Sequence, residues 1–235
     1  EDDVINKNTN NRYTTSAKVD ISLSKKVQLQ FNLNGYLYDR LYNQSSLNPI
    51  DYAYNTSRAI SAYNEDNSYA FYKKAARKNY KNFNILNELE NSYQKQQTNG
   101  FTVTANLRYN MADWLFFNAT VSGTTSNSNI EGYWGEKTYY AANLRNSEYG
   151  EVPEPDSRMP YGGELSINTV NGKSYTARIQ SNINKYLGDD MQHFFNVALG
   201  GEANSNRYAG YSDIQRGYYL DRGKKFMSDI PSGYS

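Results

Sequence analysis

The sequence predicts an all-β fold, an antiparallel transmembrane β-barrel to which the 235 residues contribute about six long strands as three hairpins with two long extracellular loops. Three observations lead to this prediction. Apolar and polar side chains alternate over stretches of about ten residues. The turns within strand pairs are short, whereas the connections between pairs are long. The mean hydropathy is -0.87, yet 15% of the residues are aromatic, and disordered chains are poor in aromatic residues.

Composition excludes several other classes of protein. The formal net charge is +1, which predicts no nucleic-acid partner. The chain has no cysteine, so it holds neither disulfides nor thiolate metal sites. No run approaches the roughly 18 apolar residues of a membrane-spanning helix, whereas a barrel strand alternates lipid-facing and lumen-facing side chains and needs no such run.

The first strand pair is expected near residues 14–38. One face of its first strand is apolar, at Ala17, Val19, Ile21 and Leu23. After a turn at residues 24–26 the alternation restarts at Val27 and runs through Leu29, Phe31 and Leu33. This period of two indicates strands with one apolar and one polar face.

Two further pairs repeat this pattern, near residues 100–124 and 173–205. The second pair turns at residues 111–113, beside Trp114, where an interfacial belt of aromatic residues would place a tryptophan. The third pair turns at residues 187–190. Between the pairs lie two long loops, residues 39–99 and 125–172, which compact soluble domains seldom contain. Inside the first loop, Asn84 is expected to cap a short helix that carries Glu88 in its first turn.

Two stretches of the first loop resemble a known family. Residues 63–68, Tyr-Asn-Glu-Asp-Asn-Ser, are similar to the YNEDGS stretch of SusC/RagA-like TonB-dependent outer-membrane transporters. Residues 84–92, Asn-Ile-Leu-Asn-Glu-Leu-Glu-Asn-Ser, are similar to that family's NPLAELENS segment. The sequence departs from the family at Asn67, where glycine is usual, and at Ile85, where proline is usual.

The resemblance implies a larger assembly. Members of this family have an N-terminal plug and a barrel of about 22 strands, so residues 1–235 would form one partial barrel domain without the plug. It further implies import of glycan or peptide oligomers, energy supplied by TonB, a SusD-like lid lipoprotein as partner, and contact with the lipids of a Gram-negative outer membrane. No cofactor is expected.

Aromatic residues of the two long loops are the candidate ligand contacts, because their rings stack on sugars or peptide side chains. They are Trp134, Tyr133, Tyr139, Tyr140 and Tyr63. For each ring, packing within the loops or against the lid partner is an alternative role. A second candidate group is the polar, lumen-facing wall, which in this family would also bond to the plug; its members are Arg108, Arg178, Asn106 and Gln180.

An enzymatic function is not predicted, nor is a metal site. The single histidine, His193, stands at the start of a strand, and none of the common catalytic motifs is present. A soluble extracellular β-sandwich that binds carbohydrate is the main alternative, although sandwich strands usually run only about 5–6 residues. A barrel adhesin or a passive porin would share the strand pattern.

Overall fold

A computed structural model describes residues 8–188, 193–220 and 225–226, and shows an open antiparallel sheet with the strand order β1-β2-β5-β6-β7-β8-β9. The prediction of an all-β antiparallel fold is confirmed. The strands of this sheet are β1 (Thr9–Ser22), β2 (Val27–Tyr42), β5 (Ser92–Ala112), β6 (Leu115–Trp134), β7 (Gly163–Leu187), β8 (His193–Tyr219) and β9 (Lys225–Phe226).

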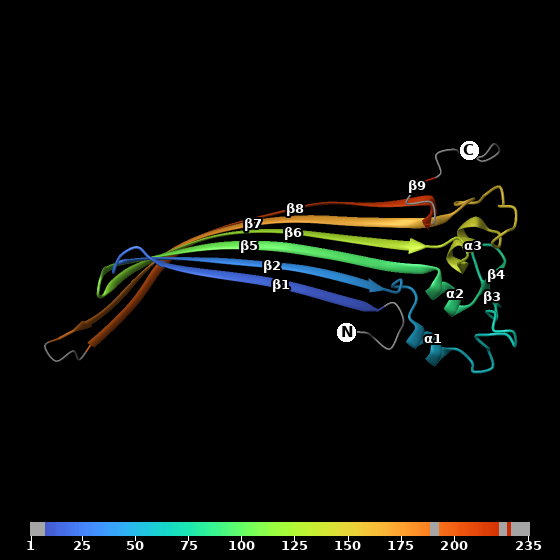
Figure 1. The fold of residues 1–235 in the computed structure, drawn as a ribbon, viewed down its shortest axis with the longest axis horizontal. Coiled ribbons are helices and arrows are strands. Elements are labelled where there is room, and N and C mark those ends of the chain that lie inside the picture. Colours follow the sequence, from blue (N-terminus) through green and yellow to red (C-terminus); the bar gives the residue numbers. More distant parts are fainter. Residues whose placement is uncertain (1–7, 189–192, 221–224, 227–235) are drawn as a thin grey trace.

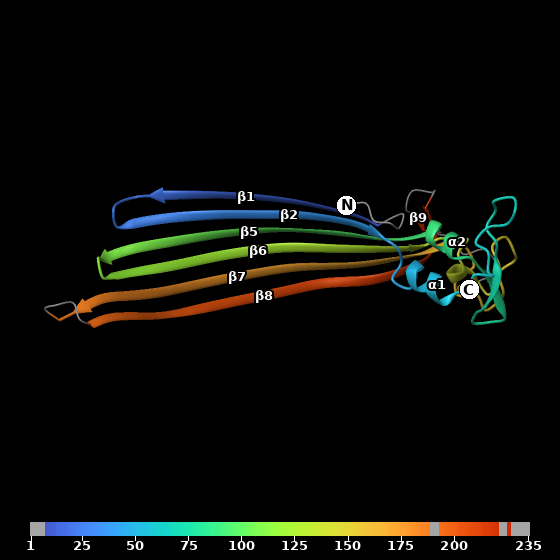
Figure 2. The same ribbon diagram turned by 90° about the horizontal axis from the view of Figure 1, so that it is seen from below.

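The three predicted hairpins are β1–β2, β5–β6 and β7–β8, and the strand ends that they join lie at the same end of the sheet (Figure 1). The turn of β5–β6 consists of Asp113 and Trp114, whereas the sequence placed it at residues 111–113, because β5 continues through Met111 and Ala112. The turn of β7–β8 begins at Gly188, where φ is +97°, and its residues 189–192 lie outside the described part of the chain. At the opposite end, the connections between hairpins form a folded head, which Figure 2 shows from a second direction.

The strands are longer than the alternation predicted. β5 begins at Ser92 and β6 continues to Trp134, so the two loops shrink to residues 43–91 and 135–162. The added segment Gln94–Asn99 of β5 is polar on both faces, and it pairs with β2 on one side and β6 on the other. Backbone hydrogen bonding continues there although the hydrophobic period does not, so the sequence pattern cannot locate these ends of the strands.

The head contains three short helices and a small hairpin. The helices are α1 (Pro49–Asn55), α2 (Ile85–Glu90) and α3 (Tyr139–Arg145), and the hairpin joins β3 (Tyr72–Ala75) to β4 (Tyr80–Phe83). The helix start predicted at Asn84 is confirmed, because its side chain accepts hydrogen bonds from the amides of Leu86 and Asn87. No helix in the described residues has both the length and the apolar character that crossing a membrane requires.

The sheet has two chemically different faces. Residues directly opposite in the register share a face, and one such row is entirely apolar; we call its side of the sheet the apolar face. The row is Val19, Phe31, Ala105, Val121, Ala177 and Ala203. The adjoining row on the polar face is Asp20, Gln30, Asn106, Thr120, Arg178 and Glu202.

Buried apolar side chains gather at the head rather than along the sheet. Among the described residues, the buried apolar side chains are Phe83, Tyr133, Ala141, Ala142, Met159, Leu165 and Tyr218. By contrast, Val121 and Ile179 of the apolar face are each 61% exposed and Leu199 is 65% exposed. A monomeric soluble protein rarely exposes such a large contiguous apolar surface, so this face needs a covering medium or partner.

Candidate functional site

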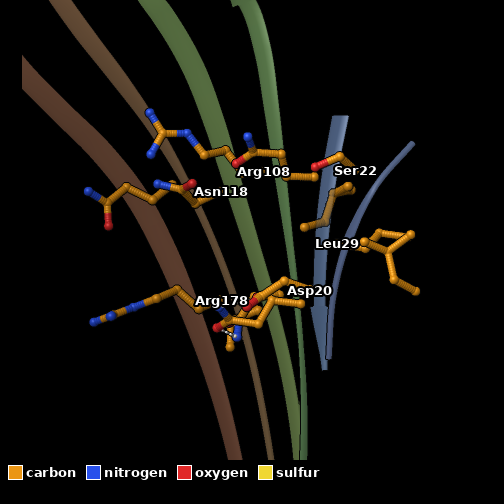
Figure 3. A pocket seen from close by; sticks show the side chains of 13 residues that line it. Asp20, Ser22, Leu29, Arg108, Asn118 and Arg178 are labelled. Carbon is orange, nitrogen blue, oxygen red and sulfur yellow. Dashed lines mark hydrogen bonds between the residues drawn. The ribbon is translucent and has the colours of Figure 1, made fainter. Parts of the chain in front are cut away.

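The four residues predicted to form a polar wall lie together on the polar face. Arg108 and Asn106 belong to β5, and Arg178 and Gln180 belong to β7; all four border a hollow of about 600 Å³. Figure 3 shows Arg108 and Arg178 extending to one side of the strands while Leu29 extends to the other. The alternation of side chains along β5 and β7 is what brings them to one surface.

Hydrogen bonds connect this wall across the strands. The Gln30 amide donates to Asp20 Oδ1 at 2.8 Å, and Thr120 Oγ1 donates to Asn106 Oδ1 at 2.8 Å. Asn106 Nδ2 donates to Gln30 Oε1 at 3.3 Å, which joins the two pairs into one row from β1 to β6. Cross-strand polar pairs of this kind contribute roughly 0.2–1 kcal/mol each, so the row helps to set the register of the sheet.

The two arginines of the wall differ in their charge partners. Arg178 Nε lies 2.9 Å from Glu202 Oε2 on β8, which makes an ion pair. Arg108 Nε donates to Asn110 Oδ1 at 3.1 Å and its guanidinium lies 4.2 Å from the Phe116 ring centre. Arg108 has no ion pair with any residue in the described part of the chain. Within the hollow, Arg108 is therefore the guanidinium best placed to meet an acceptor from outside this sheet.

Of the five aromatic residues predicted to contact ligand, Trp134 and Tyr140 lie on each other. Their rings stack with centres 4.5 Å apart and planes 17° apart. The Tyr140 hydroxyl donates to Glu164 Oε1 at 2.6 Å, and Arg216 Nε pairs with Glu164 Oε2 at 2.9 Å. Burial, followed by the bond to Glu164, raises the pKa of Tyr140 to about 12, so the hydroxyl remains a donor. The ring stack joins α3 to β6, and the contacts of Glu164 extend this connection to β7 and β8.

The other three aromatic residues have different surroundings. Tyr133 is 8% exposed and packs edge-on against Tyr218 at 5.5 Å, beside Leu165. Tyr139 packs edge-on against Phe83 at 5.5 Å, and its hydroxyl donates to the Ala75 carbonyl. Tyr63 is 50% exposed and lies 5.8 Å from the Tyr69 ring. Every one of the five has a ring partner in the structure, and Tyr63 is the most open to a ligand.

The two stretches that resemble the transporter family lie against each other. Asn84 Nδ2 donates to the carbonyls of Ala62 and Ala70 at 2.8 Å each, which brackets the turn at residues 63–69. The Tyr69 hydroxyl donates to Glu90 Oε2 at 2.6 Å. These contacts mean that the second stretch holds the first in place, and nothing in the sequence spacing indicated that they touch.

Both departures from the family pattern have simple backbone explanations. Asn67 has a φ of +64°, a left-handed conformation that glycine adopts freely and asparagine tolerates better than most residues. Ile85 is the first residue of α2, the position where proline fits a helix best. Each substitution therefore leaves the local fold intact.

Glu88 is the residue whose importance the sequence did not reveal. Its side chain is 1% exposed, and Oε1 accepts a hydrogen bond of 2.6 Å from the amide of Tyr139, the first residue of α3. A carboxylate at a helix N-terminus meets unpaired amides there. Glu88 thus connects α2 in the first loop to α3 in the second, a contact between segments 51 residues apart.

Glu88 predicts a pH dependence of this connection. Burial raises its pKa from 4.5 to about 7, against the lowering effect of the hydrogen bonds from Tyr139 and Tyr140. Between these values the folded loops bind the proton more tightly than unfolded loops do, so their stability is greatest at low pH and falls as pH rises towards 7. The loss is roughly 3 kcal/mol. Hydrogen exchange of α2 and α3 from pH 4.5 to 8, corrected for intrinsic rates, measures it.

The matched variants for this measurement are two carboxyl-to-amide changes in the head. We expect Glu88→Gln to flatten the pH dependence, because the amide does not titrate. Glu154→Gln replaces an exposed carboxylate and should keep the wild-type slope. A Glu88→Gln variant with an unchanged slope would assign the pH dependence to another group.

The histidine considered for catalysis lies apart from these sites. His193 is the exposed first residue of β8, directly opposite Leu187 at the turn end of the sheet. In the described residues, no group of three or more His, Cys, Asp or Glu side chains is arranged to hold a metal ion. Comparison of the chain with protein-family models and with curated proteins gives no match.

Proposed function

We propose that this chain forms part of the wall of an outer-membrane β-barrel, and that the barrel imports an oligomeric nutrient. The observation that carries the proposal is the exposed apolar face of the sheet, backed by a polar face with a hydrogen-bonded row. Transmembrane barrels place apolar side chains towards lipid and polar side chains towards the lumen on alternating positions. A soluble domain would have to cover the apolar face with protein.

The height of the apolar face supports this proposal. On β7 it is bounded by Lys173 and Lys185, and the positions that share their face between them are Tyr175, Ala177, Ile179, Ser181 and Ile183. These two lysines are 12 positions apart, or roughly 40 Å along a strand at about 3.3 Å per residue. A tilt of about 40° reduces the span to about 30 Å, the thickness of a bilayer's hydrocarbon core.

The ends of the sheet also fit this function. Barrels of the outer membrane have short turns on the periplasmic side and long loops outside. The sheet has the tight turns of β1–β2 and β5–β6 at one end and a folded head at the other. Within the described residues, β1 pairs only with β2, and most of β8 pairs only with β7. Open edges are not viable in lipid, so further strands would complete the barrel.

Among outer-membrane barrels, we propose that this one is a SusC/RagA-like TonB-dependent transporter with a SusD-like lid. It rests on the resemblance at residues 63–68 and 84–92, and the contact between those two stretches gives both a shared structural role. Under this assignment, Arg108, Arg178, Asn106 and Gln180 face the plug, and Tyr63 lies at the head where the solute and the lid would arrive. Catalysis plays no part in it.

The test is the behaviour of the full-length protein expressed with its own export signal. We expect it in the outer-membrane fraction, migrating faster on gels when unboiled than when boiled, because folded barrels resist the detergent. A soluble protein without this shift would refute the barrel and favour the carbohydrate-binding β-sandwich. An outer-membrane protein that takes up solute without TonB would retain the barrel and refute the transporter assignment.

A further inference from the structure

Two cationic residues lie side by side at the head-facing border of the apolar face. Lys173 on β7 is directly opposite Arg207 on β8 in the register, and both side chains are exposed. They share the face of Tyr175 and Ala177, because positions two apart on a strand point the same way. Directly opposite residues have Cβ atoms only about 4.5–5.5 Å apart, so the two charges are neighbours.

Within the described residues, no acidic side chain compensates the charge of this pair. Neither Lys173 nor Arg207 forms an ion pair with a residue in the ranges that the structure describes. The neighbours on the same face are uncharged: Thr125 in the same row, Tyr175 and Ser205 below it, and Asn171 and Ala209 above it. Like charges placed directly opposite destabilise a sheet, and an anion between them would remove that cost.

The surface beyond the pair changes from apolar to amide-rich. Towards the turns lie Tyr175, Ala177 and Ile179. Towards the head, Asn99, Asn127 and Asn171 form a row across β5, β6 and β7, and Asn127 Nδ2 donates to Asn171 Oδ1. Amide side chains carry both donors and acceptors, which suits hydroxyl and amide groups of a sugar. Apolar, cationic and amide zones thus follow one another along β7, at Tyr175, Lys173 and Asn171.

We propose that Lys173 and Arg207 bind the phosphate of a phosphorylated glycolipid in the outer leaflet. The inference rests on the proposed barrel, because it requires the apolar face to meet acyl chains. The phosphate then lies between the two cations, the chains lie along Tyr175 and Ile179, and the sugar meets the asparagine row. A guanidinium beside an ammonium is well suited to phosphate oxygens.

The cation at the other border has a different environment. Lys185 lies at the turn end of β7, with its ammonium 5.1 Å from the centre of the Trp114 ring. It stands as a single cation on an aromatic ring, an arrangement stabilised without an anion. The structure therefore assigns phosphate binding to the head-facing border alone, and Lys185 provides a control.

The experiment is native mass spectrometry of the full-length protein in detergent, titrated with monophosphoryl lipid A. Lys173→Gln/Arg207→Gln should weaken lipid A binding roughly tenfold or more, from two lost charge contacts. Lys185→Gln should bind as the wild type does. The wild type should bind dephosphorylated lipid A as weakly as the double variant binds the phosphorylated form. The wild type should also bind phosphatidylglycerol more weakly than monophosphoryl lipid A.

Each contrary result has a specific meaning. Equal binding of lipid A by the wild type and the double variant overturns the phosphate site. Equal binding of phosphatidylglycerol and lipid A by the wild type overturns the assignment to a glycolipid. The same samples are run unboiled and boiled on gels. A wild-type protein without the mobility shift refutes the proposed barrel. If the wild type shows the shift but the double variant binds lipid A as the wild type does, only this inference is refuted.

Discussion

Replacing Val121 by arginine is expected to destabilise the membrane-inserted protein by about 2–4 kcal/mol. Val121 is 61% exposed and stands near the middle of the apolar face, between Ala105 and Ala177 in the register. In a barrel this position faces the hydrocarbon core, where a guanidinium must be desolvated or reach for the interface. Urea titration of the full-length protein folded into lipid vesicles measures the change.

The control for this variant is Thr176→Arg. Thr176 is opposite Ser122 on the polar face and is adjacent in sequence to Ala177, the partner of Val121. On that face the arginine meets water or polar groups, so we expect a change within about 0.5 kcal/mol. If Val121→Arg were equally harmless, the apolar face would be in contact with water, and the barrel proposal would fail.

Removing the Asn84 side chain is expected to loosen the head by about 3 kcal/mol. Asn84 is 2% exposed and makes four hydrogen bonds, two from helix amides and two to the carbonyls of Ala62 and Ala70. Asn84→Ala leaves these groups, which are at least part-buried in their hydrogen bonds, without their partner. Each such group costs about 1–3 kcal/mol unless water reaches it. Hydrogen exchange at residues 62–70 and 85–91 should accelerate roughly 100-fold.

Asn48 offers a matched comparison in the same head. It caps α1 through hydrogen bonds from the amides of Ile50 and Asp51, but it is exposed and bridges no second segment. Asn48→Ala should therefore cost about 1 kcal/mol, the ordinary value of an N-cap. Similar exchange rates in the two variants would show that Asn84 acts only as a cap and does not hold the turn at residues 63–69.

The candidate site was only partly predictable from the sequence. The polar wall could be predicted, because alternation alone places Arg108 and Arg178 on the same face as Asn106 and Gln180. The partners of the five aromatic residues could not, because Trp134, which the sequence placed in a loop, lies at the end of β6 and stacks on Tyr140 of α3. Glu88 gave no signal beyond its place in a helix, since its burial depends on α3, which follows it by 51 residues at Tyr139.

The sequence by itself determined the strand pairs near the turns, the two faces of the sheet and the cap at Asn84, because each follows from local periodicity or from a side chain bonding to its own neighbourhood. Only the tertiary structure decided how far the strands continue beyond the apolar face, since residues such as Gln94–Asn99 are held by backbone pairing that leaves no hydrophobic pattern. It also decided the folding of the head and the adjacency of Lys173 and Arg207. These depend on contacts and register between distant segments, and register is a property of two strands together.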